Sequence, residues 1–194
     1  MERKEIPTIG IAGAGFGCGV THFTLLLANY LAGMELETVA VLEWNQSHAF
    51  QEFLAICTGS TPKKGPVPLL GADYFPSSGV RDLEFCLQKG YGYILMDFGT
   101  LGEIPSPEFL QCRRKFFLGA LNEWKIQDLL RQKERIVKER GSWTFLAAFG
   151  GKEARKELAR RFGLSFEQIP YSPDAFFIER DMAVFLKRIW KERG

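Results

Sequence analysis

The stretch "TIGIAGAGFGCGVTHF", residues 8–23, decides the fold of this chain. An apolar, β-branched run over 8–12 predicts a buried strand, and the residues after Val20 carry apolar side chains at helical spacing. Between them, glycine occupies positions 13, 15, 17 and 19. Alternating glycines let consecutive backbone N–H groups turn inward, which together with a helix start makes an anion-binding nest. The alternative is a tight strand-to-helix turn that binds no ligand. Four alternating glycines are more than such a turn needs, which favours the anion-binding interpretation.

Length and composition are those of a globular protein. The 194 residues are 46 % hydrophobic, which suffices for one well-packed core, so we expect a single domain over residues 1–194. A formal net charge of +2 gives no general attraction to nucleic acid or membrane. The four cysteines lack metal-ligand or CxxC spacing, the first residues lack a signal-peptide core, and no apolar run is long enough to span a membrane. These features predict a cytoplasmic protein.

Apolar runs alternate with amphipathic segments along the rest of the chain. Strands are expected at 38–44, 72–76, 91–99, 115–121, 143–150 and 165–173. Helices are expected at 21–33, 48–57, 79–90, 122–141, 152–163 and 176–193. Residues 58–71, rich in proline and glycine, are expected to form a loop. Apolar strands that alternate with helices predict an α/β fold with a doubly wound, mostly parallel sheet and helices on both faces.

Three segments of this predicted sheet would meet at one edge. Ligands of parallel sheets bind at the carboxyl ends of the strands. The glycine-rich segment 13–20, the pair Glu43 and Asn45, and the segment 97–99 each follow or end a predicted strand. The sequence therefore predicts a ligand site at this edge.

Two nucleotide-binding interpretations of the loop compete. A dinucleotide fingerprint GxGxxG would need glycine at position 18 or 20, where the chain has Cys18 and Val20; Glu43 would suit a ribose contact. This leaves a small Rossmann NAD(P)-binding protein as an alternative. A P-loop, GxxxxGK[ST], aligns with Gly19 as its last glycine and Thr21 as its metal-side hydroxyl. In that register valine replaces the lysine, and Asp97 takes the place of a Walker B carboxylate.

The chain resembles the ParA/MinD group of P-loop ATPases (SIMIBI class) through an ordered set of motifs. "GCGVTHFTLLLANYLAG" is similar to that group's "GVGKTTxxxNLAxxLA", and "VAVLEWNQ" to its second-strand "VLxxDxDxQ". "YGYILMDFG" resembles "YDYIIIDxP", and "EQIPYSPDAF" resembles "xxIPxDxxV", whose backbone flanks adenine in the relatives. The resemblance covers most of residues 9–176 in the same order.

The resemblance implies a site for ATP or ADP with Mg²⁺. It assigns the metal to Thr21 and Asp97, and the family's water-positioning acid to Asn45. It assigns nucleotide binding to Gly15, Phe16, Gly17, Cys18, Gly19, Val20, Thr21, His22 and Pro170.

Departures from the family pattern predict weak chemistry. The relatives carry two lysines where this chain has Gly15 and Val20, and Asn45 is an amide that cannot take a proton. Losing one charge-assisted contact costs about 1.5–3 kcal/mol, roughly 10- to 150-fold in affinity. Phosphoryl transfer suffers more because it depends on fixed positive charge around the γ-phosphate. We expect nucleotide binding with little or no hydrolysis, in a positioning or regulatory protein similar to pilus-localisation factors of the TadZ/CpaE type or to cell-division positioning proteins; the alternative is an active ATPase with an unusual loop.

Partner expectations follow from charge. Residues 113–161 hold 14 lysines and arginines against 6 acids, and the least balanced part centres on Arg155, Lys156, Arg160 and Arg161. Interleaved acids at helical spacing favour at most weak DNA binding, so a protein partner and a possible homodimer are expected. The last predicted helix could contact an anionic membrane, but packing onto the sheet is favoured. Trp124 could line the nucleotide side, but core packing is expected for it, and His48 is expected to lie at the surface.

Overall fold

The computed structural model describes residues 7–62, 64–102, 105–139 and 141–191. Within these ranges eight strands form one sheet in the order β3-β4-β2-β5-β1-β6-β7-β8. All neighbouring strands are parallel except the β3–β4 hairpin. The strands are β1 Thr8–Gly13, β2 Val39–Glu43, β3 Val67–Leu69, β4 Ala72–Phe75, β5 Tyr93–Thr100, β6 Arg114–Ala120, β7 Thr144–Phe149 and β8 Glu167–Gln168.

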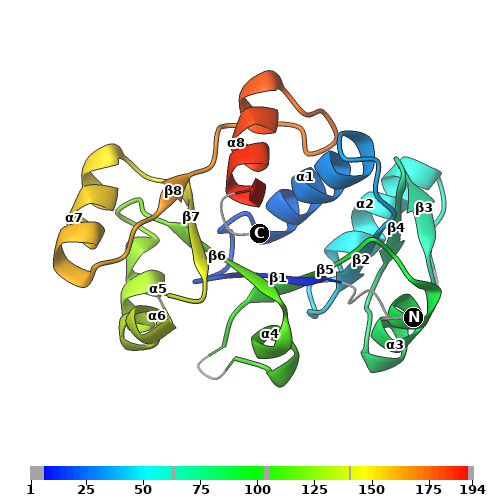
Figure 1. Cartoon of the computed structure of the whole chain (residues 1–194), viewed down its shortest axis with the longest axis horizontal. Helices are drawn as coiled ribbons and strands as arrows, with labels where there is room; N and C mark the ends of the chain where they lie inside the picture. The colour runs from blue at the N-terminus through cyan, green and yellow to red at the C-terminus, as the bar shows by residue number, and fades with distance from the viewer. Residues whose placement is uncertain (1–6, 63, 103–104, 140, 192–194) are drawn as a thin grey trace.

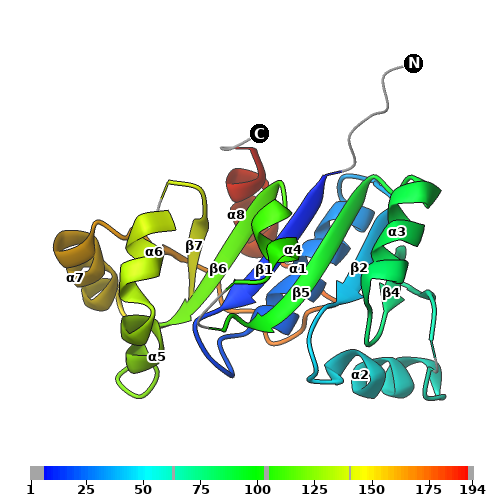
Figure 2. The same cartoon turned by 90° about the horizontal axis from the view of Figure 1, so that it is seen from below.

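Helices cover both faces of this sheet (Figures 1 and 2). Helices α1 (Val20–Gly33) and α8 (Arg180–Lys191) lie on one face. Helices α3 (Val80–Lys89), α4 (Pro107–Gln111), α5 (Ile126–Arg131) and α6 (Lys133–Glu139) lie on the other, while α7 (Lys152–Phe162) lies beside β8. Helix α2 (Ala49–Thr58) follows β2. The predicted fold class, a doubly wound and mostly parallel α/β sheet, is confirmed.

The core lies on both sides of the central strands. Strands β1, β2, β5 and β6 are buried almost throughout, which explains their continuous apolar sequences. Helix α1 is buried from Phe23 to Leu31, and the ring centroids of Phe23 and Phe116 lie 5.5 Å apart in an edge-to-face contact. Helix α8 packs beside α1, and the ring centroid of Trp190 lies 5.0 Å from that of Tyr93, the first residue of β5. The expected packing of the last helix onto the sheet is therefore confirmed.

Several predicted boundaries are wrong for local reasons. The predicted helix 122–141 is two short helices that separate at Gln132, whose side chain bonds outside the helix. The predicted loop 58–71 contains β3, because Leu70 and Gly71 both adopt positive φ and close a hairpin to β4. Helix α4 was not expected; Ser106 accepts a hydrogen bond from Phe109 N at 3.3 Å and Pro107 begins the helix.

The end of the chain also differs from expectation. Of the predicted strand 165–173, only β8 pairs with the sheet. Helix α8 begins at Arg180 rather than at residue 176, and residues 192–193 of the predicted helix lie outside the described residues. None of the helices in the described ranges has the length and apolar character needed to cross a membrane.

Candidate functional site

The glycine loop, residues 14–19, connects the carboxyl end of β1 to α1 at the bottom of Figure 2. Gly17 and Gly19 have φ angles of 77° and 81°, a left-handed conformation that residues with a Cβ rarely adopt. Gly19 directly precedes α1 and turns the chain into the helix. Two of the four alternating glycines are therefore required by the backbone itself.

A cavity of about 550 Å³ opens in front of the loop. Its walls come from all three segments that the sequence predicts at this edge: residues 15–22, residues 45–47 with Ala49, and residues 98–100. A second cavity of about 190 Å³ shares Gly19 and His22 with the first. Pro170 lines this second cavity, together with Phe149 and Tyr171. The predicted residues thus divide between two adjoining hollows.

Val20 is buried at the base of the loop and directs its side chain toward the strand. A Cβ built on Gly13 would lie only 2.7 Å from Val20 Cγ2. Gly13 is consequently small because Val20 packs against it. The position that carries the phosphate lysine in a standard P-loop contributes an apolar contact to the base of the loop here.

Asp97, near the end of β5, is fully buried beside the cavity. Its Oδ1 accepts hydrogen bonds from Gly99 N at 2.8 Å and from Asn45 Nδ2 at 3.1 Å. Its Oδ2 has no hydrogen-bond partner among the described residues. Burial raises the pKa of Asp97 to about 6, with the Thr21 hydroxyl and the Gly99 N–H opposing the rise. A buried carboxylate with one vacant oxygen can take a cation as a ligand.

Asn45 and Glu43 have different roles at the end of β2. Asn45 donates from Nδ2 to Asp97 O at 2.9 Å as well as to the carboxyl, and its Oδ1 accepts from Ser47 N at 2.8 Å. Glu43 is fully buried and accepts from Phe50 N at 3.0 Å and Ser77 N at 2.9 Å. Asn45 orients Asp97 and borders the cavity, whereas the Glu43 carboxylate ties β2 to the segments that follow β2 and β4.

His22 lies between the two cavities in the first turn of α1. Its Nε2 is buried and has no hydrogen-bond partner among the described residues. Phe16 is 83 % exposed at the tip of the loop. Cys18, the neighbour of Gly17, is buried under the loop as a free thiol. All of the predicted loop residues from Gly15 to His22 therefore border the larger cavity.

Sequence reasoning missed the contact between the loop and α5. A Cβ on Gly15 would lie 2.8 Å from Asp128 Cγ, so that residue must be glycine while Asp128 stays in place. Lys125 and Gln132 also bond to the loop. In the sequence, the one sign of this contact is that positions 125, 128 and 132 are spaced to lie on one face of a helix. The expected core packing of Trp124 is wrong, since this side chain is 85 % exposed.

The predicted basic surface is divided and largely paired. On α7, Lys156 pairs with Glu153 at 2.8 Å, and Arg160 pairs with Glu157 at 2.7 Å. Arg161 pairs with the same Glu157, and Arg155 donates to Gln168 Oε1 at 2.8 Å. The bases of α5 and α6 lie on another helix pair on the far side of the sheet from α1. His48 is exposed, as expected.

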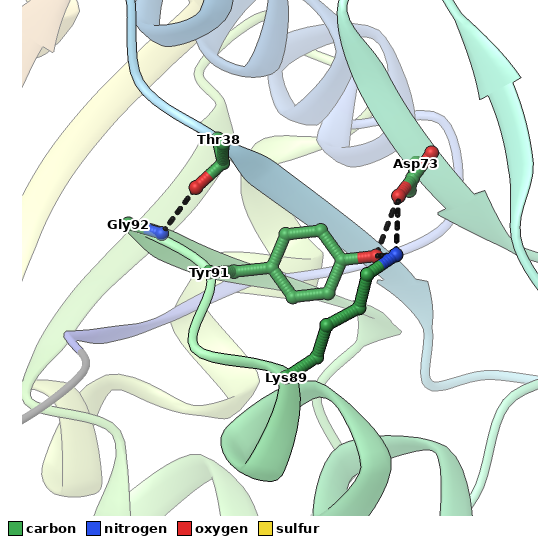
Figure 3. A network of polar contacts seen from close by, with 5 residues as sticks. All are labelled: Thr38, Asp73, Lys89, Tyr91 and Gly92. Atoms are coloured by element: carbon green, nitrogen blue, oxygen red, sulfur yellow. Dashed lines mark hydrogen bonds and ion pairs between the residues drawn. The ribbon is translucent and has the colours of Figure 1, made fainter.

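The opposite edge of the sheet carries a second polar cluster (Figure 3). Tyr91 donates its hydroxyl hydrogen to Asp73 Oδ2 at 2.5 Å, and Lys89 Nζ lies 3.2 Å from the Tyr91 oxygen and 3.5 Å from Asp73 Oδ2. Thr38 accepts from Gly92 N at 2.8 Å. Burial, followed by the bond to Asp73, raises the pKa of Tyr91. These contacts join the end of α3 to β4 and β2.

Comparisons with known proteins give structural but no sequence matches. No family model and no curated protein matches the chain. A ParA-family ATPase from Chlorobium tepidum TLS has a TM-score of 0.67 at 14 % identity, over 97 % of this chain and 94 % of its own. A plasmid partition protein from Borrelia burgdorferi B31 bound to AMPPNP has a TM-score of 0.68 at 14 % identity, over 98 % and 100 %. MinD from Aquifex aeolicus has a TM-score of 0.66 at 15 % identity, over 97 % and 98 %.

At such low identity the likeness concerns the fold. It extends over nearly the whole of both chains in each comparison. In this chain the site is built on the sheet order, on the glycine loop after β1 and on the buried Asp97 within β5. The chain therefore has the P-loop NTPase fold of the ParA-family ATPases and MinD.

Proposed function

We propose that the chain binds a nucleoside phosphate at the glycine loop and hydrolyses it little or not at all. One observation carries the proposal: Asp97 is buried directly behind Phe98 and Gly99 in the wall of a cavity that the glycine loop, Thr21 and Asn45 also border. The Thr21 hydroxyl acts on its carboxyl, and its Oδ2 has no hydrogen-bond partner among the described residues. A buried carboxylate oxygen without a partner is costly unless a ligand completes it. A phosphate on the loop with a divalent cation on Asp97 would do so.

The donor set fits ATP or ADP with Mg²⁺. Backbone N–H groups of the loop and the start of α1 would hold the phosphates. Thr21 and Asp97 would hold the metal, since Mg²⁺ prefers oxygen ligands. The smaller cavity, lined by Phe149, Pro170 and Tyr171, would take the base, and His22 would face the ligand between the two cavities. Structures of this fold include one bound to AMPPNP and one in complex with ADP, which supports a nucleotide as ligand.

Weak hydrolysis follows from the groups that face the cavity. Val20 packs against Gly13, and Gly15 carries no side chain, so neither supplies the fixed positive charge that phosphoryl transfer uses. Asn45 has both ends of its amide in hydrogen bonds and has no acidic group to position an attacking water. The chain would thus be a degenerate member of its fold class, with binding retained.

The two alternatives make different demands on these residues. A dinucleotide site would use Glu43 on a ribose, but this carboxylate is already bonded to the N–H groups of Phe50 and Ser77. An active ATPase would need a cation delivered from outside the loop. We favour a non-hydrolysing role in positioning or regulation, exercised through a protein partner or a second copy of the chain; MinD of this fold is known in a complex with MinC.

Calorimetry with ATP, ADP and NAD, each with and without Mg²⁺, tests the proposal. We expect heat with the adenine mononucleotides and none with NAD. Gly17→Val should abolish that heat, because a β-branched residue cannot adopt φ of 77° without strain. Gly33→Val, at the last residue of α1 and away from the loop, is the control. No heat with any mononucleotide at millimolar concentration would exclude the nucleotide role.

Turnover measurement tests the second half of the proposal. Phosphate release with saturating ATP and Mg²⁺ should stay at background. A rate on the order of 1–100 per second, as for ordinary kinases, would replace the proposal with an active ATPase.

A further inference from the structure

One face of the α5–α6 segment contacts three consecutive residues of the glycine loop. Lys125 Nζ donates to Phe16 O at 2.9 Å. Gln132 Nε2 donates to Ala14 O at 2.8 Å. Between them, Asp128 fills the space beside Gly15. We call Lys125, Asp128 and Gln132 the brace.

The spacing of the brace places its three members side by side. Positions 125, 128 and 132 differ by three and four residues, which places them on one side of a helix. Lys125 immediately precedes α5, Asp128 lies within it, and Gln132 lies between α5 and α6. The break between the two helices thus occurs at the residue that bonds to the loop.

Hydrogen bonds fix the orientation of Gln132. Arg135 donates to its Oε1, so its Nε2 must face the loop. The same Nε2 also lies 3.3 Å from Leu101 O, and Leu101 N donates to Gly13 O at 2.9 Å. On the other side, Ala14 N donates to Leu118 O at 2.9 Å. The start of the loop is therefore tied to the ends of β5 and β6 and to α5–α6 at once.

We propose that the brace is a positioning element for phosphate binding, which holds residues 14–16 in the binding conformation. The inference rests on the proposed function, because it concerns the affinity of that same loop. A loop without a lysine depends on its backbone N–H groups, and these bind an anion best when their orientation is set beforehand. The carbonyl groups of Ala14 and Phe16 are held by Gln132 and Lys125, which keeps the loop from rotating its carbonyl groups toward an incoming phosphate.

Two substitutions with matched controls test the brace. Lys125→Met removes the donor to Phe16 and keeps the length of the side chain. Gln132→Glu replaces the donor to Ala14 with a carboxylate oxygen. The controls are Lys133→Met and Gln127→Glu, which make the same changes at exposed positions of α6 and α5. The ligands are inorganic pyrophosphate and ADP, measured by calorimetry with Mg²⁺.

Hydrogen exchange tests whether the brace orders the loop, and ligand affinity tests whether that order serves phosphate binding. In the ligand-free protein, peptides covering residues 13–22 should exchange faster in each brace variant than in wild type. The melting temperature should fall by no more than about 2–4 °C, as for the loss of one hydrogen bond. Affinity for both ligands should fall about 3- to 10-fold per variant, the loss of one net hydrogen bond. The controls should match wild type in both measurements.

Other outcomes would contradict either the proposed function or the brace. Wild-type protein that binds neither pyrophosphate nor ADP would overturn the proposed function, and the brace with it. Wild-type binding with unchanged affinity in both brace variants would overturn the brace alone. A loss of affinity without faster exchange would also overturn it, because Lys125 would then contact the phosphate directly. If Gln132→Glu does not fold, Lys125→Met decides the question by itself.

Discussion

At the amino edge of the sheet, the side chains of Asp73, Lys89 and Tyr91 form hydrogen bonds with one another. At the carboxyl edge, by contrast, the buried Oδ2 of Asp97 has no hydrogen-bond partner among the described residues. Both clusters contain an aspartate on a strand. Only the carboxyl edge opens onto a cavity of about 550 Å³; the hollow beside the amino-edge cluster is about 220 Å³. Buried polar groups are normally satisfied within the protein, and an exception needs an explanation. The comparison sets a self-contained structural cluster at one edge against the proposed ligand site at the other.

The largest expected effect comes from restoring the lysine of the loop. Val20→Lys should tighten ATP binding by about 10- to 150-fold, because one charge-assisted contact contributes about 1.5–3 kcal/mol. It also removes the contact between Val20 and Gly13, so some folding stability should be lost. Calorimetry with ATP and Mg²⁺ measures the gain.

Val80→Lys is the matched control for this gain. Val80 is likewise the first residue of its helix, α3, and is exposed. It should leave ATP affinity unchanged. Equal gains in both variants would mean that general positive charge attracts the nucleotide, and the carboxyl-edge site would lose its support.

The two aspartates should respond in opposite directions to amidation. Asp97→Asn should raise the free energy of unfolding of the ligand-free protein at pH 8 by about 1–3 kcal/mol, because a buried charge is removed and the pKa is raised to about 6. Asp73→Asn should lower it by about 1–2 kcal/mol, since the short bond from Tyr91 and the ion pair with Lys89 weaken. Urea unfolding of both variants provides the comparison. A loss of stability in Asp97→Asn would make Asp97 a structural acid like Asp73.

The pKa of Asp97 also fixes the direction in which folding stability changes with pH. The pKa of Asp97 is raised from 3.8 to about 6 in the folded chain, so the unfolded chain releases this proton first as pH rises. Stability from this group is therefore present below about pH 4, declines up to about pH 6 and is absent above. The stability difference between Asp97→Asn and wild type should open over that range. Mg²⁺-dependent nucleotide binding should change the other way, strengthening as pH passes 6, because only the carboxylate holds the metal.

The fold could be predicted from the sequence because its signals are local and repeated. Buried strands such as β1, β2 and β5 have no polar face, and the glycine loop ends one of them. The contacts behind the loop could not be predicted this way. The amphipathic pattern continues through Gln132, and only hydrogen bonds to Ala14 and Leu101, distant in sequence, break the helix there.

A smaller effect is expected from the hydroxyl at the amino edge. Tyr91→Phe removes the bond to Asp73 and the acceptor for Lys89 while keeping the ring, so it should cost about 1 kcal/mol of folding stability. ADP affinity should stay unchanged. Thermal unfolding and calorimetry on the same sample separate the two. A fall in ADP affinity at constant stability would show that the two edges are coupled, and the amino edge would cease to be a purely structural reference.

The smallest effect concerns the other place where phosphate groups could bind, the basic surface of α7. Arg160 and Arg161 both pair with Glu157, and chiefly the hydrogen bond from Arg160 lowers the pKa of that carboxyl to about 2. Duplex DNA should therefore bind weakly at about 50 mM salt and be released at about 200 mM, since few phosphate contacts form. Glu157→Gln frees two guanidinium groups and should strengthen the low-salt binding by about two- to fivefold. Glu134→Gln changes the same charge on exposed α6 and should have less effect. Tight wild-type binding at 200 mM would instead make α7 a functional phosphate-binding surface, and DNA rather than a protein would become the favoured partner.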